Sequence, residues 1–186
     1  MEPGAARVTN TIGNLQAAFH GETNAHARYL AFAAKADEEG YGNVASLFRA
    51  AARAEKIHAE NHAAVIRLLR AEPREVIETP EVRSTRENLE AAILGETYER
   101  DEMYPAFTAR AEAEGLRPAV NTFRLAQKVE AGHVRLYERA LGKLGDQHGT
   151  GAAYLVCPVC GCTAAMAEFE SCPVCSTAIE DFEEHR

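Results

Sequence analysis

The chain has 186 residues, a length that is enough for one well-packed core and a small appended domain, and its formal net charge is −8. Its acidic balance argues against unassisted binding to nucleic acid and to anionic membrane surfaces. The sequence contains no apolar run near the ~20 residues that span a bilayer, and its N-terminal stretch MEPGAARVTN has no signal-peptide core. We therefore expect a cytoplasmic protein that has neither nucleic acid nor a membrane as a partner.

Four long helical patterns fill most of the chain. They cover approximately residues 10–39, 43–71, 85–114 and 118–144. Gly40 and Gly115 end the first and third patterns, and Pro118 suits the first turn of the fourth. Two tight glycine turns and one longer connection, residues 72–85, predict two antiparallel hairpins joined by a crossover. This arrangement is an all-α four-helix bundle of the ferritin-like type.

An internal repeat places one glutamate in the middle of each helical pattern: Glu22, Glu55, Glu96 and Glu130. An alanine stands four residues before every one of them, and a leucine or phenylalanine stands seven residues before. These offsets lie on one stripe of a helix, the stripe that faces the core. The glutamates also stand at similar distances from the Gly40 and Gly115 turns, so we predict that they meet in one layer inside the bundle.

The position three residues after each glutamate adds to this layer, because residues i and i+3 share a helix face. It holds Ala25, His58, Glu99 and His133. Burying the five carboxylates bare would cost several kcal/mol for each ion, so the layer needs compensating cations, and two divalent ions supply four positive charges. A carboxylate-rich site with some imidazole suits iron or manganese, whereas zinc usually takes fewer ligands with more nitrogen or sulfur.

A solvated helix face is the alternative interpretation of these acids, and it is the ordinary one for a single Glu-x-x-His motif. Four matching heights and four matching alanines favour the inward-facing layer instead. Asp101 and Glu102 lie off the stripe and are expected to face water. Pro105 lies inside the third pattern, where it removes a backbone hydrogen bond and predicts a local kink just beyond Glu99.

The last part of the chain is short and rich in cysteine. We interpret DQHGTGA, residues 146–152, as a flexible linker. Residues 153–186 then contain two CxxC motifs, with Cys157, Cys160, Cys172 and Cys175. Four thiolates from two CxxC turns form one tetrahedral metal site, for which the spacing alone leaves zinc and iron open. Cys162 is the fifth cysteine, either a spare thiol or an alternative ligand.

These features together resemble the rubrerythrins. The family resemblance lies in the segments GETNAHARY and AEKIHAENH and in the paired CxxC motifs. Seven positions also match the family's di-iron ligands: Glu22, Glu55, His58, Glu96, Glu99, Glu130 and His133. The resemblance implies a di-iron bundle at 1–145, the linker at 146–152, and a rubredoxin-like domain of β and turn structure at 153–186. That domain would hold one iron, or zinc, on its four paired cysteines. Glu99 is the ligand that six-ligand bacterioferritin-type sites lack.

The resemblance also implies the activity. Rubrerythrins reduce hydrogen peroxide to water, which protects the cell against oxidative stress, with electrons relayed from the rubredoxin-like iron to the two irons. Glu99 and His58 would exchange as ligands of one iron when its oxidation state changes. Tyr29 and Tyr104 match tyrosines that hydrogen-bond ligand carboxylates, with core packing alone as the alternative. We therefore expect catalytic roles for Glu99, His58, Tyr29 and Tyr104, and a supporting or structural role for His62.

The implied partners are hydrogen peroxide, an electron donor such as rubredoxin or an NAD(P)H-dependent reductase, and a second copy of the chain. A homodimer is implied because the family's electron path often runs from one subunit to the other. Two other functions stay open: a ferroxidase or iron-storage protein with an attached metal ribbon, and a non-catalytic structural protein filled with zinc. Glu99 favours the peroxide reductase.

Overall fold

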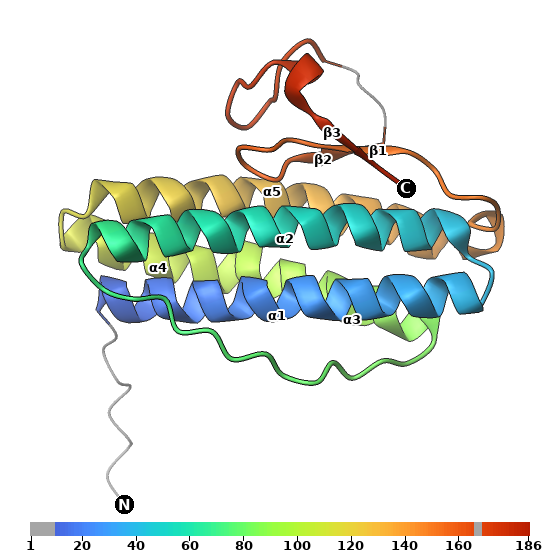
Figure 1. The fold of residues 1–186 in the computed structure, drawn as a ribbon, viewed down its shortest axis with the longest axis horizontal. Helices are drawn as coiled ribbons and strands as arrows, with labels where there is room; N and C mark the ends of the chain where they lie inside the picture. Colours follow the sequence, from blue (N-terminus) through green and yellow to red (C-terminus); the bar gives the residue numbers. More distant parts are fainter. Residues whose placement is uncertain (1–9, 166–168) are drawn as a thin grey trace, which may run out of the picture.

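We describe residues 10–165 and 169–186 of a computed structural model (Figure 1). Its helical body consists of α1 (Thr11–Glu38), α2 (Gly42–Leu68), α3 (Thr85–Tyr98), the π-helical turn η1 (Glu99–Met103), α4 (Tyr104–Ala113) and α5 (Arg117–Gly142). α1 packs against α2, and α3, η1 and α4 together pack against α5. The predicted ferritin-like four-helix bundle is confirmed.

Local sequence explains where several of these helices begin and end. Asn10 caps α1, because its side-chain oxygen accepts a hydrogen bond from Gly13 N at 2.7 Å. Ser84 and Glu87 form a capping box at the start of α3. The residues that end α1 and α4 are followed by glycines in the left-handed conformation, with φ of +79° at Gly40 and +70° at Gly115.

α2 ends earlier than predicted, at Leu68 instead of about Ala71. Arg70 takes a left-handed φ of +60°, and the Ala71 N–H donates to the Ile66 carbonyl at 3.1 Å. Such a closing turn satisfies the last carbonyls of a helix. The apolar pattern of the sequence does not reveal this turn, because it depends on one backbone conformation.

The third predicted helix is not continuous, and the interruption lies beside Glu99. α3 gives way to η1, in which the Tyr104 N–H donates to the Glu99 carbonyl, and α4 carries Pro105 in its first turn. A proline ring crowds the carbonyl four residues before it, which here belongs to Asp101, and the wider π turn relieves that contact. A distortion is therefore present near Pro105, but it is a π turn that begins at Glu99 instead of a kink beyond that residue.

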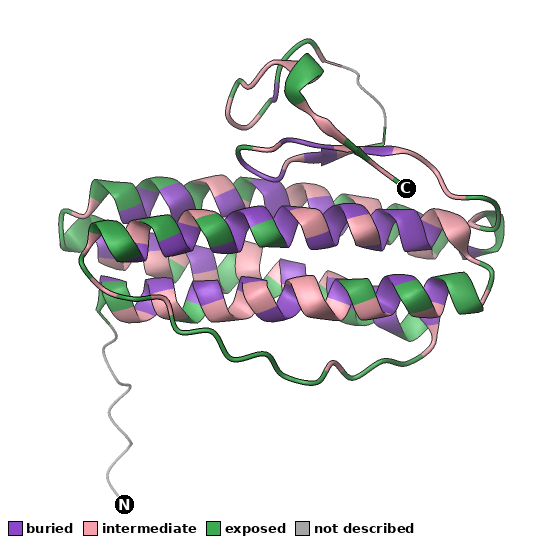
Figure 2. Cartoon of the chain, in the orientation of Figure 1, coloured by how far each residue is buried: buried purple, intermediate pink, exposed green. Residues whose placement is uncertain are grey.

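Buried residues line the facing sides of the helices (Figure 2) and form two apolar clusters in the bundle. The largest side chains that the helices contribute to the first cluster are Tyr29, Phe32, Phe48 and Tyr137. Those of the second are Phe19, Tyr104 and Phe123. On α1, Glu22 stands between Phe19 of the second cluster and Ala25 of the first. The glutamate layer therefore separates two apolar halves of the core.

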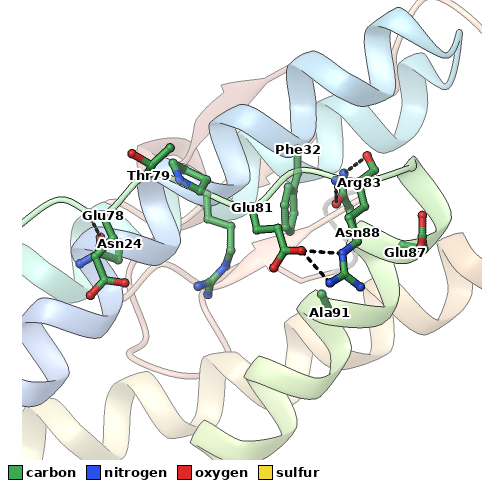
Figure 3. A pocket seen from close by; sticks show the side chains of 11 residues that line it. Asn24, Phe32, Glu78, Thr79, Glu81, Arg83, Glu87, Asn88 and Ala91 are labelled. Atoms are coloured by element: carbon green, nitrogen blue, oxygen red, sulfur yellow. Dashed lines mark hydrogen bonds and ion pairs between the residues drawn. The ribbon is translucent and has the colours of Figure 1, made fainter.

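The crossover that joins the two hairpins, residues 71–84, has no regular secondary structure and runs along α1 (Figure 1). Asn24 on α1 holds it, because its Nδ2 donates to the Val76 carbonyl at 2.9 Å and its Oδ1 accepts from Glu78 N at 2.7 Å. Figure 3 shows a surface pocket between α1, this crossover and α3. The residues that line it include Arg83, paired with Glu81, and include none of the predicted metal ligands.

The C-terminal module is a small antiparallel sheet with the strand order β2–β1–β3. Its elements are β1 (Tyr154–Val156), β2 (Thr163–Ala164), β3 (Glu183–His185) and the 3-10 turn η3 (Ile179–Asp181), and the turn η2 (Leu144–Asp146) precedes it. Val156 pairs with Thr163 on one side and with Glu183 on the other. The sheet lies over α2 and α5 (Figure 1), and its β and turn structure confirms the prediction for this region. Within the described residues, we find no helix with the apolar length of a membrane crossing.

Candidate metal centres

The bundle brings six of the seven predicted di-iron ligands together in two adjoining groups. One group contains Glu22, Glu55, His58 and Glu130, and the other contains Glu55, Glu96, Glu130 and His133. All six residues are buried, and within each group the ligand atoms lie within 4.8 Å of one another. Glu55 and Glu130 belong to both groups, so the geometry suits two cations that share two bridging carboxylates.

Glu99 stands outside both groups. It is the first residue of the π turn and is partly buried. Burial raises its pKa well above the usual range, and the carboxylates of Glu96 and Glu130 raise it further. Glu99 is therefore electrostatically coupled to the layer, and its role as a ligand stays a prediction. Asp101 and Glu102, in the same turn, are exposed as predicted.

Several buried ligand atoms converge on a common space without forming hydrogen bonds. Glu22 Oε2, Glu96 Oε2, both oxygens of Glu130 and His133 Nδ1 make no hydrogen bond within the described residues. His133 Nδ1 nevertheless lies 2.9 Å from Glu130 Oε2. Unpaired buried polar atoms are costly and rare, so this convergence fits cations held between them.

The protonation of the layer follows from burial and from the interleaved imidazoles. Burial raises the pKa of Glu22 and of Glu96, and neighbouring carboxylates raise both further. Burial also opposes charge on Glu55, but close contact with the imidazoles of His133 and His58 outweighs it and lowers the pKa of Glu55. Although burial alone would lower the pKa of His58 and His133, contact with Glu130 and Glu96 respectively raises it. Without metal, imidazolium and protonated carboxyl groups therefore neutralise the layer.

Both ligand histidines receive their orientation from the C-terminal module. His58 Nε2 lies 3.0 Å from the Cys160 carbonyl oxygen, which can only accept, so this nitrogen carries the proton. His133 Nε2 lies 3.2 Å from the Thr163 hydroxyl, which itself donates to the Gly161 carbonyl at 3.0 Å and therefore accepts from the imidazole. Each ring is thus turned so that Nδ1 faces the carboxylates, the direction that a metal ligand requires. The sequence did not reveal these partners.

Two buried tyrosines hold the outer carboxylates of the layer. Tyr29 Oη donates to Glu96 Oε1 at 2.6 Å, and Tyr104 Oη donates to Glu22 Oε1. In both carboxylates the other oxygen, Oε2, has no hydrogen bond within the described residues. Each phenol therefore fixes one oxygen and leaves the second available to a cation.

The four paired cysteines form the second candidate centre. Cys157 Sγ lies 3.5 Å from Cys175 Sγ, and Cys160 Sγ lies 3.5 Å from Cys172 Sγ. These distances are far longer than the ~2.05 Å of a disulfide, and the four atoms lie within 4.8 Å of one another, as ligands of one ion do. Cys162 stands outside this group, and its carbonyl accepts from Cys157 N.

The four-cysteine module is anchored to α2 by polar contacts around His58. Arg53 forms a bidentate ion pair with Glu183 of β3, in which Nε and Nη2 donate to the carboxylate oxygens at 2.6 and 2.9 Å. This contact lowers the pKa of Glu183 to about 2. Asn61 Nδ2 donates to the Val159 carbonyl at 2.9 Å. Gly161 permits the close approach, because a Cβ there would stand 2.9 Å from His58 Nε2. These contacts hold the two centres side by side.

Fold and geometry define a ferritin-like di-metal protein with a rubredoxin-like module, and comparison with known proteins agrees. A family model described as rubrerythrin matches residues 13–141. Nigerythrin of Nitratidesulfovibrio vulgaris is 38% identical over 90% of this chain and 83% of its own. Rubrerythrin-2 of Clostridium acetobutylicum is 34% identical over 93% and 95% of the two chains. The structure of fully reduced, all-ferrous nigerythrin superposes with a TM-score of 0.89 at 36% identity, covering 96% of this chain and 88% of that chain.

The chain belongs to the rubrerythrin family. The resemblance seen in the sequence is thereby confirmed. The Glu/His layer is the di-iron site of this family, and the four cysteines are its rubredoxin-like metal site.

Metal removal is expected to make stability depend on pH. Carboxyl groups with raised pKa, such as Glu22 and Glu96, stabilise the metal-free fold below pH ~4.5 and lose that contribution as pH rises. Imidazoles with raised pKa stabilise it below pH ~6.5 and lose their contribution as pH rises further. Metal binding instead strengthens as the ligands deprotonate. Thermal unfolding with and without ferrous ion, under anaerobic conditions, should show a larger gain from metal at pH 8 than at pH 5.5. An equal gain at both pH values would contradict this account.

Gly161→Ala should disturb the di-iron site through the module. The new Cβ would stand 2.9 Å from His58 Nε2 and 3.1 Å from Ala54 Cβ, at a φ of +78°, so the module must move away from the imidazole. Gly115→Ala is the matched control, since its φ is +70° but nothing lies within 4 Å. Both variants should lose ~1–2 kcal/mol of stability from the left-handed backbone. Only Gly161→Ala should change the absorption spectrum of the iron-loaded di-iron site, and identical spectra in both variants would rule the contact out as an influence.

Proposed function

We propose that the protein is a peroxide reductase, which reduces hydrogen peroxide to water at the di-iron site and so protects the cell against oxidative stress. The observation that carries the proposal is the hydrogen bond between His58 Nε2 and the Cys160 carbonyl. It connects a ligand of one centre to a ligand residue of the other. A reductase needs such an electron input, whereas a ferroxidase takes its electrons from the iron it oxidises.

The electron route follows covalent bonds and one hydrogen bond. It leads from Cys160 Sγ through that residue's backbone to its carbonyl, and from there to the His58 imidazole. When bound, the two irons supply the two electrons of the reaction, and the cysteine-bound iron replenishes them. Arg53 and Asn61 maintain the contact between the two centres, because they hold β3 and the first CxxC turn on α2.

Peroxide reduction also consumes protons, since H2O2 + 2e⁻ + 2H⁺ gives two waters. Glu99 is suited to hold one, because burial and the neighbouring Glu96 raise its pKa. Tyr29 and Tyr104 orient the outer carboxylates, so that the site keeps its shape while Glu99 changes position. We propose that Glu99 and His58 exchange as ligands of the same iron.

We further propose a cytoplasmic setting and an electron donor such as rubredoxin or an NAD(P)H-dependent reductase. The module lies on the bundle of its own chain, so one chain brings both centres together. A homodimer in which two bundles exchange modules would use the same contacts.

One observation favours a second candidate function, a ferroxidase or iron-storage protein. Six ligands form the two groups and Glu99 lies outside both, which matches a bacterioferritin-type ligand set. Anaerobic diferrous protein should be mixed in turn with peroxide and with dioxygen. Faster oxidation by peroxide supports the reductase. Faster oxidation by dioxygen, together with growth of a mineral core, would establish the storage function instead.

Glu99→Ala should slow peroxide turnover while leaving the fold and the six-ligand site in place. Loss of a proton-transfer group typically costs about 10²–10⁴ in rate, and we expect a kcat loss in that range. Glu102→Ala is the matched control, because Glu102 lies in the same π turn but is exposed. Steady-state peroxide assays and iron analysis of both variants would measure the effect. Full turnover in Glu99→Ala with normal iron content would refute the assigned role.

Cys172→Ser should separate the two centres. It removes a buried thiolate of the four-cysteine group, so the rubredoxin-like absorption and the donor-driven turnover should be lost. Chemically reduced di-iron should still react once with peroxide. Cys162→Ser serves as the control, since Cys162 lies outside the group and should keep both properties. Complete loss of the single turnover in Cys172→Ser would argue against separable centres.

A further inference from the structure

The two outer carboxylates of the di-iron site are held by tyrosines with different surroundings. Behind Tyr104, on the Glu22 side, His62 Nε2 lies 3.0 Å from the phenol oxygen. His62 Nδ1 in turn lies 3.0 Å from the hydroxyl of Thr122 on α5. Tyr104, His62 and Thr122 are all buried, so these contacts form a chain of hydrogen bonds that is shielded from solvent within the bundle.

Among the described residues, the Glu96 side shows no such chain of hydrogen bonds. Behind Tyr29 stands Tyr137, with the two ring centroids 5.7 Å apart. The Tyr137 hydroxyl is buried and makes no hydrogen bond within the described residues. The two halves of the site therefore have similar ligands but differ in the hydrogen bonds behind the tyrosines that hold those ligands.

When Glu22 is ionised, the available protons allow only one donor-to-acceptor direction for the hydrogen bonds that link Thr122, His62, Tyr104 and Glu22. A carboxylate only accepts, so the Tyr104 hydroxyl must donate to it. The phenol oxygen then accepts from His62 Nε2, which must carry the imidazole proton. His62 Nδ1 is left bare, and it accepts from the Thr122 hydroxyl. The Tyr104 hydroxyl and both nitrogens of His62 have their partners in this single arrangement.

The surroundings of His62 keep the ring neutral and fixed. Burial lowers its pKa to about 3, so the imidazole carries one N–H near neutral pH. The ring packs between Tyr104 and Phe123, with centroid distances of 5.9 and 5.6 Å. A neutral, immobile ring with its proton on Nε2 acts as a fixed donor to the phenol.

We propose that His62 and Thr122 are positioning residues that act through Tyr104 and make the Glu22 side of the di-iron site the more firmly held side. The proposal rests on the di-iron function but not on which oxidant the site reduces. Linked hydrogen bonds polarise one another, so donation from His62 strengthens the bond from Tyr104 to Glu22 Oε1. Glu22 Oε2, which has no hydrogen-bond partner among the described residues, then stays directed at the metal position.

The first test reads the proton position directly. In protein loaded with diamagnetic zinc ion, nitrogen-15 NMR should show His62 protonated at Nε2 and bare at Nδ1. Thr122→Val removes the donor to Nδ1 and should move the Nδ1 resonance. Thr108→Val is the matched control, because the Thr108 hydroxyl is buried without a partner in the described residues, and it should leave the resonance unchanged. A proton on Nδ1 in the loaded wild-type protein would overturn the proposal.

The second test asks whether His62 acts through Tyr104, with cobalt ion as the probe of metal affinity. Loss of an outer-shell partner typically costs about 10–100-fold in metal affinity, and Tyr104→Phe should weaken one of the two cobalt-binding steps by that amount. His62→Leu should weaken the same step, and His62→Gln, whose amide N–H can replace Nε2–H, should restore most of it.

In the Tyr104→Phe background, His62→Leu should have no further effect on cobalt binding. An equal loss in both backgrounds, or a fall in thermal stability without a change in cobalt affinity, would show a packing role and overturn the proposal. Neither test uses peroxide, so a protein that proves to be a ferroxidase would still give an answer.

Discussion

Negative charge buried between the helices is the constraint on which the rest of the structure depends. Glu22, Glu55, Glu96 and Glu130 are buried in one layer, where bare carboxylates are too costly to persist. The layer divides the core into two apolar halves that fix its height and shape. Metal ions are what make this arrangement stable, because they replace the protons and imidazolium groups that otherwise neutralise it. Stability and chemistry thus depend on the same side chains.

The C-terminal module contributes to the di-iron site as well as to electron supply. Its Cys160 carbonyl and Thr163 hydroxyl fix the tautomers of the two ligand histidines, His58 and His133. The same residues lie beside the cysteine site, so docking of the module also orients two ligands of the di-iron site. Arg53 and Gly161 serve this docking, one by charge pairing with β3 and the other by leaving room for the imidazole.

The two halves of the di-iron site have similar ligands, but the residues that hold their outer carboxylates differ. Glu22 and Glu96 each accept from a tyrosine, but within the part of the chain that the structure describes a hydrogen-bonded chain continues only from Tyr104. The π turn that begins at Glu99 adds a second asymmetry, because it interrupts only the helix that carries Glu96. The two halves of the site therefore differ both in the support of their outer carboxylates and in the helix beside them.

The sequence by itself determined the helices, the inward glutamates and the cysteine site, because helical periodicity and CxxC spacing are local properties. Tyr29 and Tyr104 were also found from sequence, through their match to the family, and Pro105 predicted a distortion of the third helical pattern, although not its form as a π turn. Only the tertiary structure decided how the histidines are oriented. His58 and Cys160 are 102 residues apart, and His62 and Thr122 are 60 apart. A backbone carbonyl carries no sequence signal, and a long-range contact exists only after two elements have packed together.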